Sequence, residues 1–226
     1  MNATRRPVVL FGTGQAASVA HMVLTHDSPY EVIAFTVDQA FLTDRTFLGL
    51  PVVPFESVEH CYPPSTFGMH IAIGYVRMNR LRAERYDQAK AKGYELITHV
   101  SRRAITWPDL VIGDNCWIMD NSVVQPYTTI GNNVYIGGSS HVGHHVVVED
   151  HCFIAGCVAI PGTVRIQSYS FIGMGAAMRQ GVTIARDCII GAGAVILRDT
   201  REKGVYVAPQ AVLLPTPSDA VAFDLR

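Results

Sequence analysis

The second half of the chain repeats with a period of six residues. From Ile112 to Ile196 every sixth position is aliphatic or Met, and the residue four positions after each, from Cys116 to Thr200, is small or β-branched. An α-helix would place residues six apart on different faces, and an isolated strand does not require a small residue at every such step. A parallel β-helix explains both features, because three hexads close one triangular coil of about 18 residues.

The predicted β-helix has five coils, with the aliphatic residues inside the prism. Glycine, Asn and Asp recur where corners are expected, as in Gly113–Asn115, Gly131–Asn133 and Gly143, because corners need unusual backbone angles. The fifteen inward positions are Ile112, Ile118, Val124, Ile130, Ile136, Val142, Val148, Ile154, Ile160, Ile166, Ile172, Met178, Ile184, Ile190 and Ile196.

Three cysteines and two tryptophans lie at regular places in this repeat. Cys116, Cys152 and Cys188 are 36 residues apart, which is two coils. Strands of adjacent coils are about 4.8 Å apart, so neighbouring thiols would be about 10 Å apart and could not share a metal ion. We predict that they are small core residues.

Trp107 and Trp117 flank the first coil, and we expect them to cap the open end of the prism.

The first hundred residues alternate between apolar β-branched segments and helical segments. A strand leads into the tight turn Gly12–Gly14, and Asp38 follows the second strand at about the distance of a ribose-binding acid. This alternation is typical of a small parallel α/β sheet of the Rossmann-like type. The predicted strands are 7–11, 31–37, 69–73 and 94–100, with a surface helix within 75–93. The predicted domains are 1–103 (α/β), 104–201 (β-helix) and 202–226 (C-terminal loop and tail).

Composition narrows the class of protein. With 49% hydrophobic and 16% charged residues, the chain contains enough apolar sequence to fold fully. The net charge of −1 gives no basic field to hold a nucleic acid. No apolar stretch approaches the roughly 18 residues of a membrane span, and the N-terminus lacks the long apolar region of a signal peptide. Five cysteines without a CxxC pair fit a reducing compartment, so we expect a cytoplasmic protein.

Several motifs resemble those of a known family. They are Ile112-Gly-Asp-Asn115, Ile130-Gly-Asn-Asn133, Ile190-Gly-Ala-Gly-Ala194 and Ser140-His-Val-Gly-His144, preceded by Gly12-Thr-Gly14 and Ala72-Ile-Gly74. Over roughly residues 7 to 205 the chain resembles the left-handed β-helix sugar acyltransferases of bacteria. That family includes the NeuD-type sialic acid O-acyltransferases and the UDP-4-amino-sugar N-acetyltransferases of bacillosamine synthesis.

The resemblance implies an activity and an assembly. The enzyme would move an acetyl group from acetyl-CoA to an amino or hydroxyl group of a nucleotide-linked sugar, by direct attack on the thioester. The family forms homotrimers with active sites between neighbouring β-helices. Two alternatives stay open: an O-acetyltransferase acting on a free sialic-acid-like sugar, and a non-catalytic scaffold that binds sugar nucleotides.

A cluster of histidines suggests either a metal site or a general base. The β-helices of gamma-class carbonic anhydrases hold zinc with a pair of histidines five residues apart and a third two coils away. No two of the clustered histidines have that spacing, and none has a histidine two coils before it, so we expect no metal. The clustered histidines are His141, His144, His145 and His151.

The resemblance instead implies that His144 is the general base. Gly162 lies one coil on and would stack beside it, and its backbone N–H would donate to the thioester oxyanion. His145 occupies the position where amino-sugar members of the family carry a carboxylate that orients the base. That substitution leaves O-acylation as open as N-acylation, and spacing does not decide whether Glu149 or Asp150 replaces the carboxylate.

The ligand contacts follow from the same resemblance. The segment Gly12-Thr-Gly14-Gln-Ala-Ala17 resembles the glycine-rich turn of dinucleotide-binding proteins, but Ala17 stands where the third glycine of that motif would be. The first hundred residues are also too few to form a full dinucleotide site. The closing loop 204–212 lacks a glycine and a basic residue of the family, so we expect no salt bridge to the CoA 3′-phosphate. The implied substrate-binding residues are Thr13, Gly14, Gln15, Asp38 and Gly74, and the implied CoA-binding residues are Gly162, Met174 and Ala192.

Overall fold

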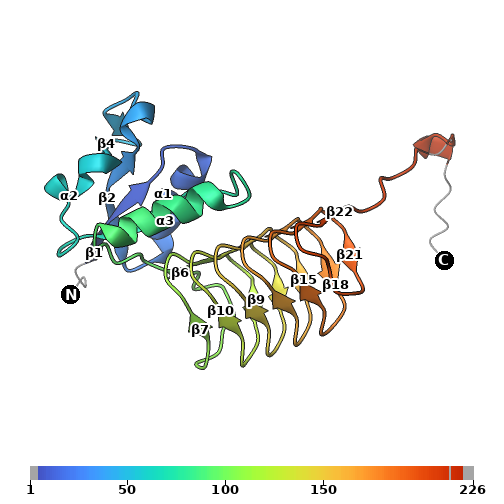
Figure 1. The fold of residues 1–226 in the computed structure, drawn as a ribbon. Helices are drawn as coiled ribbons and strands as arrows, with labels where there is room; N and C mark the ends of the chain where they lie inside the picture. The colour runs from blue at the N-terminus through green and yellow to red at the C-terminus, as the bar shows by residue number, and fades with distance from the viewer. Residues whose placement is uncertain (1–4, 214, 221–226) are drawn as a thin grey trace.

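The computed structural model describes residues 5–213 and 215–220. An α/β part is followed by a parallel β-helix, and the α/β part sits over the first coils (Figure 1). No helix within the described residues is long and apolar enough to cross a membrane. The α/β part contains β1 (Arg6–Phe11), α1 (Gln15–Asp27), β2 (Tyr30–Val37), η1 (Gln39–Phe41), β3 (Thr46–Phe47), β4 (Leu50–Pro54), η2 (Phe55–Ser57), α2 (Val58–Cys61), β5 (Gly68–Ile71) and α3 (Arg80–Ala91).

The α/β sheet has the strand order β3-β4-β2-β1-β5, and all its neighbours are parallel except the β3–β4 hairpin. The chain moves from β1 to β2 and β4 on one side, and then returns to add β5 on the other side of β1. The predicted Rossmann-like sheet is therefore present, with one further parallel strand, β4, that the sequence analysis did not include. The strand order reverses between β1 and β5, which is where ligands bind in open α/β sheets.

The β-helix consists of two-residue strands that pair at an offset of 18 residues, as in Tyr135↔Phe153 and Thr129↔Val147, except at its C-terminal end, where Ile189 pairs with Val205. They form three parallel sheets, which are the three faces of the predicted prism. The strands are β6 (His99–Val100), β7 (Val111–Ile112), β8 (Trp117–Ile118), β9 (Val123–Val124), β10 (Thr129–Ile130), β11 (Tyr135–Ile136), β12 (His141–Val142), β13 (Val147–Val148), β14 (Phe153–Ile154), β15 (Ala159–Ile160), β16 (Arg165–Ile166), β17 (Phe171–Ile172), β18 (Ala177–Met178), β19 (Thr183–Ile184), β20 (Ile189–Ile190), β21 (Val195–Ile196) and β22 (Val205–Tyr206); η3 (Ser218–Ala220) follows.

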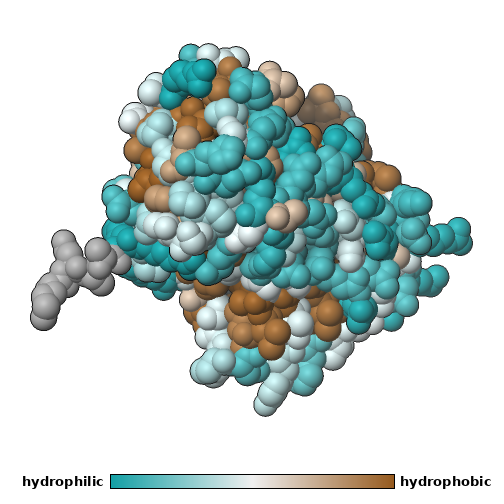
Figure 2. All heavy atoms as spheres, turned by 60° about the vertical axis from the view of Figure 1, so that its left-hand side comes forward, coloured by the Kyte–Doolittle hydropathy of each residue, from teal (hydrophilic) through white to brown (hydrophobic). Residues whose placement is uncertain are grey.

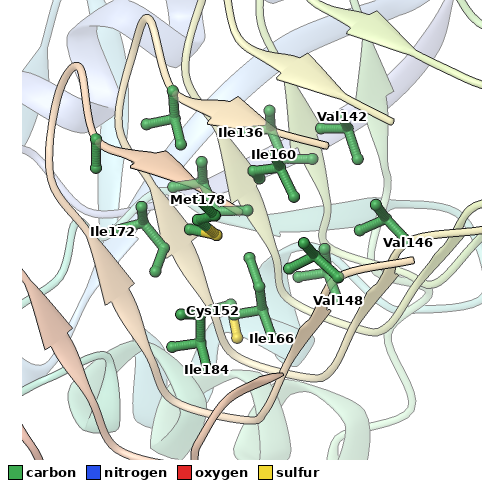
Figure 3. Packing of buried hydrophobic residues seen from close by; sticks show 14 of the residues in the cluster. Ile136, Val142, Val146, Val148, Cys152, Ile160, Ile166, Ile172, Met178 and Ile184 are labelled. Atoms are coloured by element: carbon green, nitrogen blue, oxygen red, sulfur yellow. The ribbon is translucent and has the colours of Figure 1, made fainter. Parts of the chain in front are cut away.

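The interior of the prism is dry and aliphatic. Side chains from all three faces point toward one another along the axis (Figure 3). Cys116, Cys152 and Cys188 are buried among them, as predicted. Burial raises the pKa of the Cys116 and Cys152 thiols to about 12, because the low-dielectric core disfavours a thiolate. These two thiols are therefore packing groups with little nucleophilic character.

The predicted strand 94–100 is divided between the two parts of the molecule. Leu96 bridges Met69 in the α/β region, whereas β6 pairs with β8 in the β-helix. The chain thus leaves one sheet and enters the first coil within a few residues. The β-helix ladder also includes β22, beyond residue 201. The division of the chain at residues 103 and 201 stays a prediction.

One corner of the prism joins the two parts through a column of polar side chains. Asn115 and Asn133 have left-handed φ angles of 53° and 57°, which Asn adopts more readily than most residues. Asn115 Nδ2 donates to Asn133 Oδ1 at 2.8 Å, and Asn115 Oδ1 accepts the backbone N–H of Ile71 at 2.8 Å. This column of asparagine side chains therefore fixes the end of β5 against the first coils.

Neither tryptophan caps the prism, so that prediction is wrong. Trp117 points outward from β8 and is 4% exposed, with its ring 4.8 Å from His70 and 4.6 Å from His99. It fills the interface between the α/β part and the β-helix, because inward positions alternate with outward ones along each strand. Trp107 is half exposed and lies beside His144.

Candidate active site

His144 lies at the prism corner between β12 and β13. The α/β part packs on a different face, the outer face formed by β6, β8, β11, β14, β17, β20 and β22. Each coil runs from β11 through β12 and β13 to β14, so the corner at His144 is the one that does not border this face. Within one chain, the histidine and the α/β part therefore lie on opposite sides of the prism.

His144 makes hydrogen bonds at its ring and at its backbone N–H. Its Nδ1 lies 3.1 Å from Nδ1 of His145, and its backbone N–H donates to Oε1 of Gln125 at 3.1 Å. The ring of His145 is packed against Tyr127, with 4.7 Å between the centroids. Two Nδ1 atoms at this distance share one proton, so one ring donates and the other accepts. When His144 is the donor, its Nε2 carries a free lone pair.

The histidine pair opens into a shallow hollow of about 470 Å³. Its walls are mainly apolar, and Trp107 and Tyr127 contribute large exposed rings. The hollow is open to solvent along the prism edge. The lining residues are Ile105, Trp107, Val123, Gln125, Pro126, Tyr127, His144 and His145.

Gly162 lies directly against the imidazole of His144, as its spacing of one coil predicts. A Cβ on Gly162 would lie 2.5 Å from Cε1 and 2.6 Å from Nε2 of His144, so only glycine fits beside the ring in this position. Among the described residues, the backbone N–H of Gly162 has no hydrogen-bond partner. This N–H is free to donate to an oxygen atom placed beside Nε2.

Met174 and Ala192 lie at a different corner of the prism. Met174 lies between β17 and β18, and Ala192 lies one coil later, between β20 and β21. Both residues are exposed. The face of β12, β15 and β18 separates this corner from His144 and Gly162. One chain therefore does not bring all the predicted CoA-binding residues together.

The α/β part contains a second cavity, of about 280 Å³, at the carboxyl ends of β1 and β5. Gln15 and Gly74, both predicted to bind substrate, line it. Gly14 is the N-cap of α1, and nothing lies within 4 Å of where its Cβ would be. The preceding turn needs glycine, since Gly12 has φ of 116° and a Cβ there would meet the Ala72 carbonyl oxygen at 3.1 Å. Thr13 lies between these two glycines.

Asp38 is not part of this cavity. Its Oδ2 accepts hydrogen bonds from Arg85 at 2.6 and 3.1 Å, and it lines a separate hollow with Glu56 and Lys92. The ion pair neutralises the carboxylate that was predicted to contact a ribose. The structure therefore brings Gln15 and Gly74 together, without Asp38.

The residues that close the cavity from the other side were not predicted from the sequence. Trp117, Tyr135 and Phe153 project from successive coils of the β-helix, and Tyr75 covers Phe153 with 5.0 Å between ring centroids. The Tyr135 and Phe153 rings stack at 4.4 Å. The 18-residue spacing of aromatic residues at outward positions was the signal that could have revealed this wall.

Arg82 is the other residue that the sequence analysis missed. It lines the cavity and is only 3% exposed, yet it forms no ion pair with any carboxylate of the described residues. Burial lowers the pKa of its guanidinium to about 10, but the group stays charged at neutral pH. The described residues contain no group of three or more His, Cys, Asp or Glu that could hold a metal ion.

Comparison with known proteins supports the fold and the class of enzyme. The family model for the bacterial transferase hexapeptide (six repeats) matches residues 109–140, 127–162 and 163–198. No curated protein gives a significant match. Several solved structures do match over nearly the whole chain.

The matching structures include several that are 26% identical to this chain. A mutant of perosamine N-acetyltransferase from Caulobacter crescentus, in complex with CoA and GDP-perosamine, has a TM-score of 0.82 at 26% identity, covering 89% of this chain and 93% of its own. The acetyltransferase domain of PglB from Neisseria gonorrhoeae, in complex with acetyl coenzyme A, has a TM-score of 0.81 at 26% identity, covering 90% and 97%. WeeI from Acinetobacter baumannii shares the fold, with a TM-score of 0.74 at 18% identity over 89% and 97%.

A hexapeptide-repeat β-helix behind a small α/β sheet, shared with acetyltransferases of known structure, identifies the chain as an acyltransferase. The matched hexapeptide repeats span residues 109–198, and the chain resembles the left-handed β-helix sugar acyltransferases.

Proposed function

We propose that this enzyme transfers an acetyl group from acetyl-CoA to an amino group of a nucleotide-linked sugar. The observation that carries the proposal is the contact between His144 and Gly162, which pairs a proton acceptor with a free N–H. The two relatives at 26% identity support an amino acceptor, because both are named acetyltransferases and one is named for an N-acetyl transfer to a GDP-linked amino sugar.

His144 acts as the general base in this mechanism. The acceptor nitrogen attacks the thioester carbonyl carbon while Nε2 of His144 removes its proton. The carbonyl oxygen becomes an oxyanion and accepts the hydrogen bond of the Gly162 N–H. The intermediate then collapses, the carbon–sulfur bond breaks, and the CoA sulfur takes the proton from the imidazolium. No thiol of the described residues lines the hollow beside His144, so the acceptor attacks the thioester directly, without a covalent enzyme intermediate.

His145 is a positioning residue for this base. Its Nδ1 accepts the Nδ1–H of His144 and so selects the tautomer in which Nε2 faces the substrate. The packing of His145 against Tyr127 holds the accepting ring in place. His145 thus takes over the orienting role of a carboxylate, without the negative charge that would stabilise an imidazolium.

The nucleotide-linked sugar occupies the cavity at the carboxyl ends of β1 and β5, where Gln15 and Gly74 lie. This cavity and His144 lie on opposite sides of one prism, so a single chain does not offer both to one substrate. We propose a homotrimer in which the cavity of one copy faces His144 of the next. Acetyl-CoA lies between the β-helices, where Met174 and Ala192 of one copy approach Gly162 of another.

Exposed apolar residues on the β-helix support this assembly. Hydrophobic side chains gather on the lower part of the molecule, over the β-helix and below the α/β part (Figure 2). A monomer rarely exposes apolar residues in a continuous patch without a partner. The exposed apolar residues of the β-helix include Ile105, Trp107, Val111, Tyr127, Val195 and Leu197.

A thiol-release assay tests the activity. Acetyl-CoA is mixed with UDP-, GDP- and dTDP-linked amino and deoxy sugars, and free CoA thiol is measured. Thiol release with one amino-sugar nucleotide, together with an acetylated product found by mass spectrometry, is the expected result. Release only with a free sialic-acid-like sugar would replace the proposal with O-acetylation. Binding of a sugar nucleotide without release or transfer would indicate the scaffold.

A further inference from the structure

The buried guanidinium of Arg82 lines the cavity at the carboxyl ends of β1 and β5. We propose that Arg82 binds a phosphate group of the acceptor and makes this cavity selective for phosphate-bearing ligands. The inference rests on the proposed function only for the identity of the ligand, because the binding itself needs neither acetyl-CoA nor His144.

The hydrogen bonds of Arg82 leave its charge uncompensated. Nε donates to Oδ1 of Asn133 at 3.1 Å, and Nη2 donates to the backbone oxygens of Asn133, His151 and Cys152 at 3.1 to 3.4 Å. All of these acceptors are neutral. A buried charge without a counterion is strongly disfavoured, so an anion that enters the cavity would gain a partner that is already in place.

One arm of the guanidinium is available to a ligand. Nη1 has a single long hydrogen bond, to the carbonyl oxygen of Gly74 at 3.4 Å, although it carries two N–H groups. Gly74 lines the same cavity, so this arm is at the cavity wall. Nη2 and Nε anchor the group to the β-helix while Nη1 is left to bind.

The cavity walls favour a phosphate attached to a ring. The first residues of α1, Gln15 and Ala16, form one side, and a helix N-terminus favours an anion there. On the other side lie the rings of Tyr135, Phe153 and Tyr75, which offer flat apolar surface to a base or a sugar. The volume of about 280 Å³ suits one such ring with its phosphate.

Arg82 also holds the α/β part against the β-helix, so removing it tests two roles together. A filled cavity separates them. Ala16 is exposed on α1 and lines the cavity, so Ala16→Phe fills the space and leaves Arg82 and its anchors unchanged. Met22 is exposed on the same helix and does not line the cavity, so Met22→Phe is the matched control.

The experiment is calorimetric titration of the full chain, without acetyl-CoA, with five probes: UDP, GDP, uridine, inorganic pyrophosphate and free N-acetylneuraminate. We expect a nucleoside diphosphate to bind, and uridine to bind at least about 10-fold more weakly, because hydrogen bonds to a charged group are the strong ones. Ala16→Phe and Arg82→Gln should both weaken nucleoside diphosphate binding by about 10-fold or more, and Met22→Phe should not. Arg82→Lys should retain part of the binding, since it keeps the charge and loses the planar fork.

Four results would contradict the inference. Equal affinity for uridine and UDP would show that the charge is not used. Unchanged UDP and GDP binding in Ala16→Phe would place the ligand elsewhere. Binding of free N-acetylneuraminate in preference to every phosphate-bearing probe would assign Arg82 to a carboxylate instead. Pyrophosphate binding as tight as that of UDP would show that the aromatic wall adds nothing, and would contradict the ring-bearing ligand.

If the phosphate probes bind as expected but no acetyl transfer occurs, the proposed function fails and this inference stands.

Discussion

The backbone of Gly162 lies against the imidazole of His144, so closely that a Cβ at position 162 would be 2.6 Å from Nε2. This contact results from the coil spacing, because residue 162 is one full coil after residue 144. It places a free N–H beside the only ring nitrogen of His144 that His145 does not contact.

The first prediction concerns this glycine. Gly162→Ala should lower kcat by about 100-fold, because the added methyl displaces the imidazole from the N–H that stabilises the oxyanion. Steady-state kinetics of thiol release measure the effect, and thermal unfolding shows whether the fold is retained. Gly49→Asn is the control, since Gly49 has φ of 80° and open space around its Cβ in the α/β part. Wild-type kinetics in Gly162→Ala would exclude the oxyanion role.

A second prediction tests the histidine pair. His144→Ala should reduce transfer by about 100-fold or more, as expected for the loss of a general base. His145→Phe should reduce kcat by about 10-fold with little change in KM, whereas His145→Gln should retain more activity because its amide oxygen can accept the Nδ1–H. Comparison of the two substitutions separates tautomer selection from packing. A His145→Gln enzyme no more active than His145→Phe would argue against tautomer selection.

A third prediction follows from the position of the two sites on opposite sides of the prism. His144→Ala and Ala16→Phe should each lower kcat/KM strongly when expressed alone, and co-expression of the two variants should restore part of the activity. In randomly mixed trimers roughly a quarter of the sites would pair an intact cavity with an intact histidine. The measurement is kcat/KM per subunit of the purified mixture. Absence of any recovery in mixed trimers that are confirmed by mass spectrometry would indicate that each chain works by itself.

A fourth prediction concerns stability in acid. Burial lowers the pKa of His70 from 6.5 to about 4, and burial also lowers the pKa of His99 and His151. All three lie where the α/β part meets the β-helix. Between pH 6.5 and 4 the unfolded chain binds a proton that folded His70 does not bind, so the free energy of unfolding falls as the pH falls. For His70 the loss approaches about 2 kcal/mol at pH 5.

Urea unfolding at pH 7 and pH 5 measures this loss. His70→Asn should show a smaller difference between the two pH values, because the amide can still donate to the Ile97 carbonyl that His70 Nδ1 contacts at 3.2 Å. His26→Asn is the control, since His26 is exposed in the last turn of α1. An identical pH dependence in wild type and His70→Asn would contradict the prediction.

The sequence by itself determined the β-helix. A period of six leaves one inward aliphatic and one small residue in every hexad, and no other regular structure satisfies both over fifteen hexads. The same spacing predicted the contact of Gly162 with His144 and the burial of the three core cysteines. These features follow from residues at fixed separations along one chain, so local geometry is enough to place them.

The tertiary structure alone decided how the α/β part meets the β-helix. Trp117 was expected at the end of the prism, yet it packs between His70 and His99, because contacts between two parts of a chain have no period in the sequence. Asp38 had the spacing of a ribose-binding acid, but its ion pair with Arg85 depends on the position of α3. Arg82 looked like one of several cations on a surface helix. Only the packing of that helix against the coils shows that its charge is buried and faces a cavity.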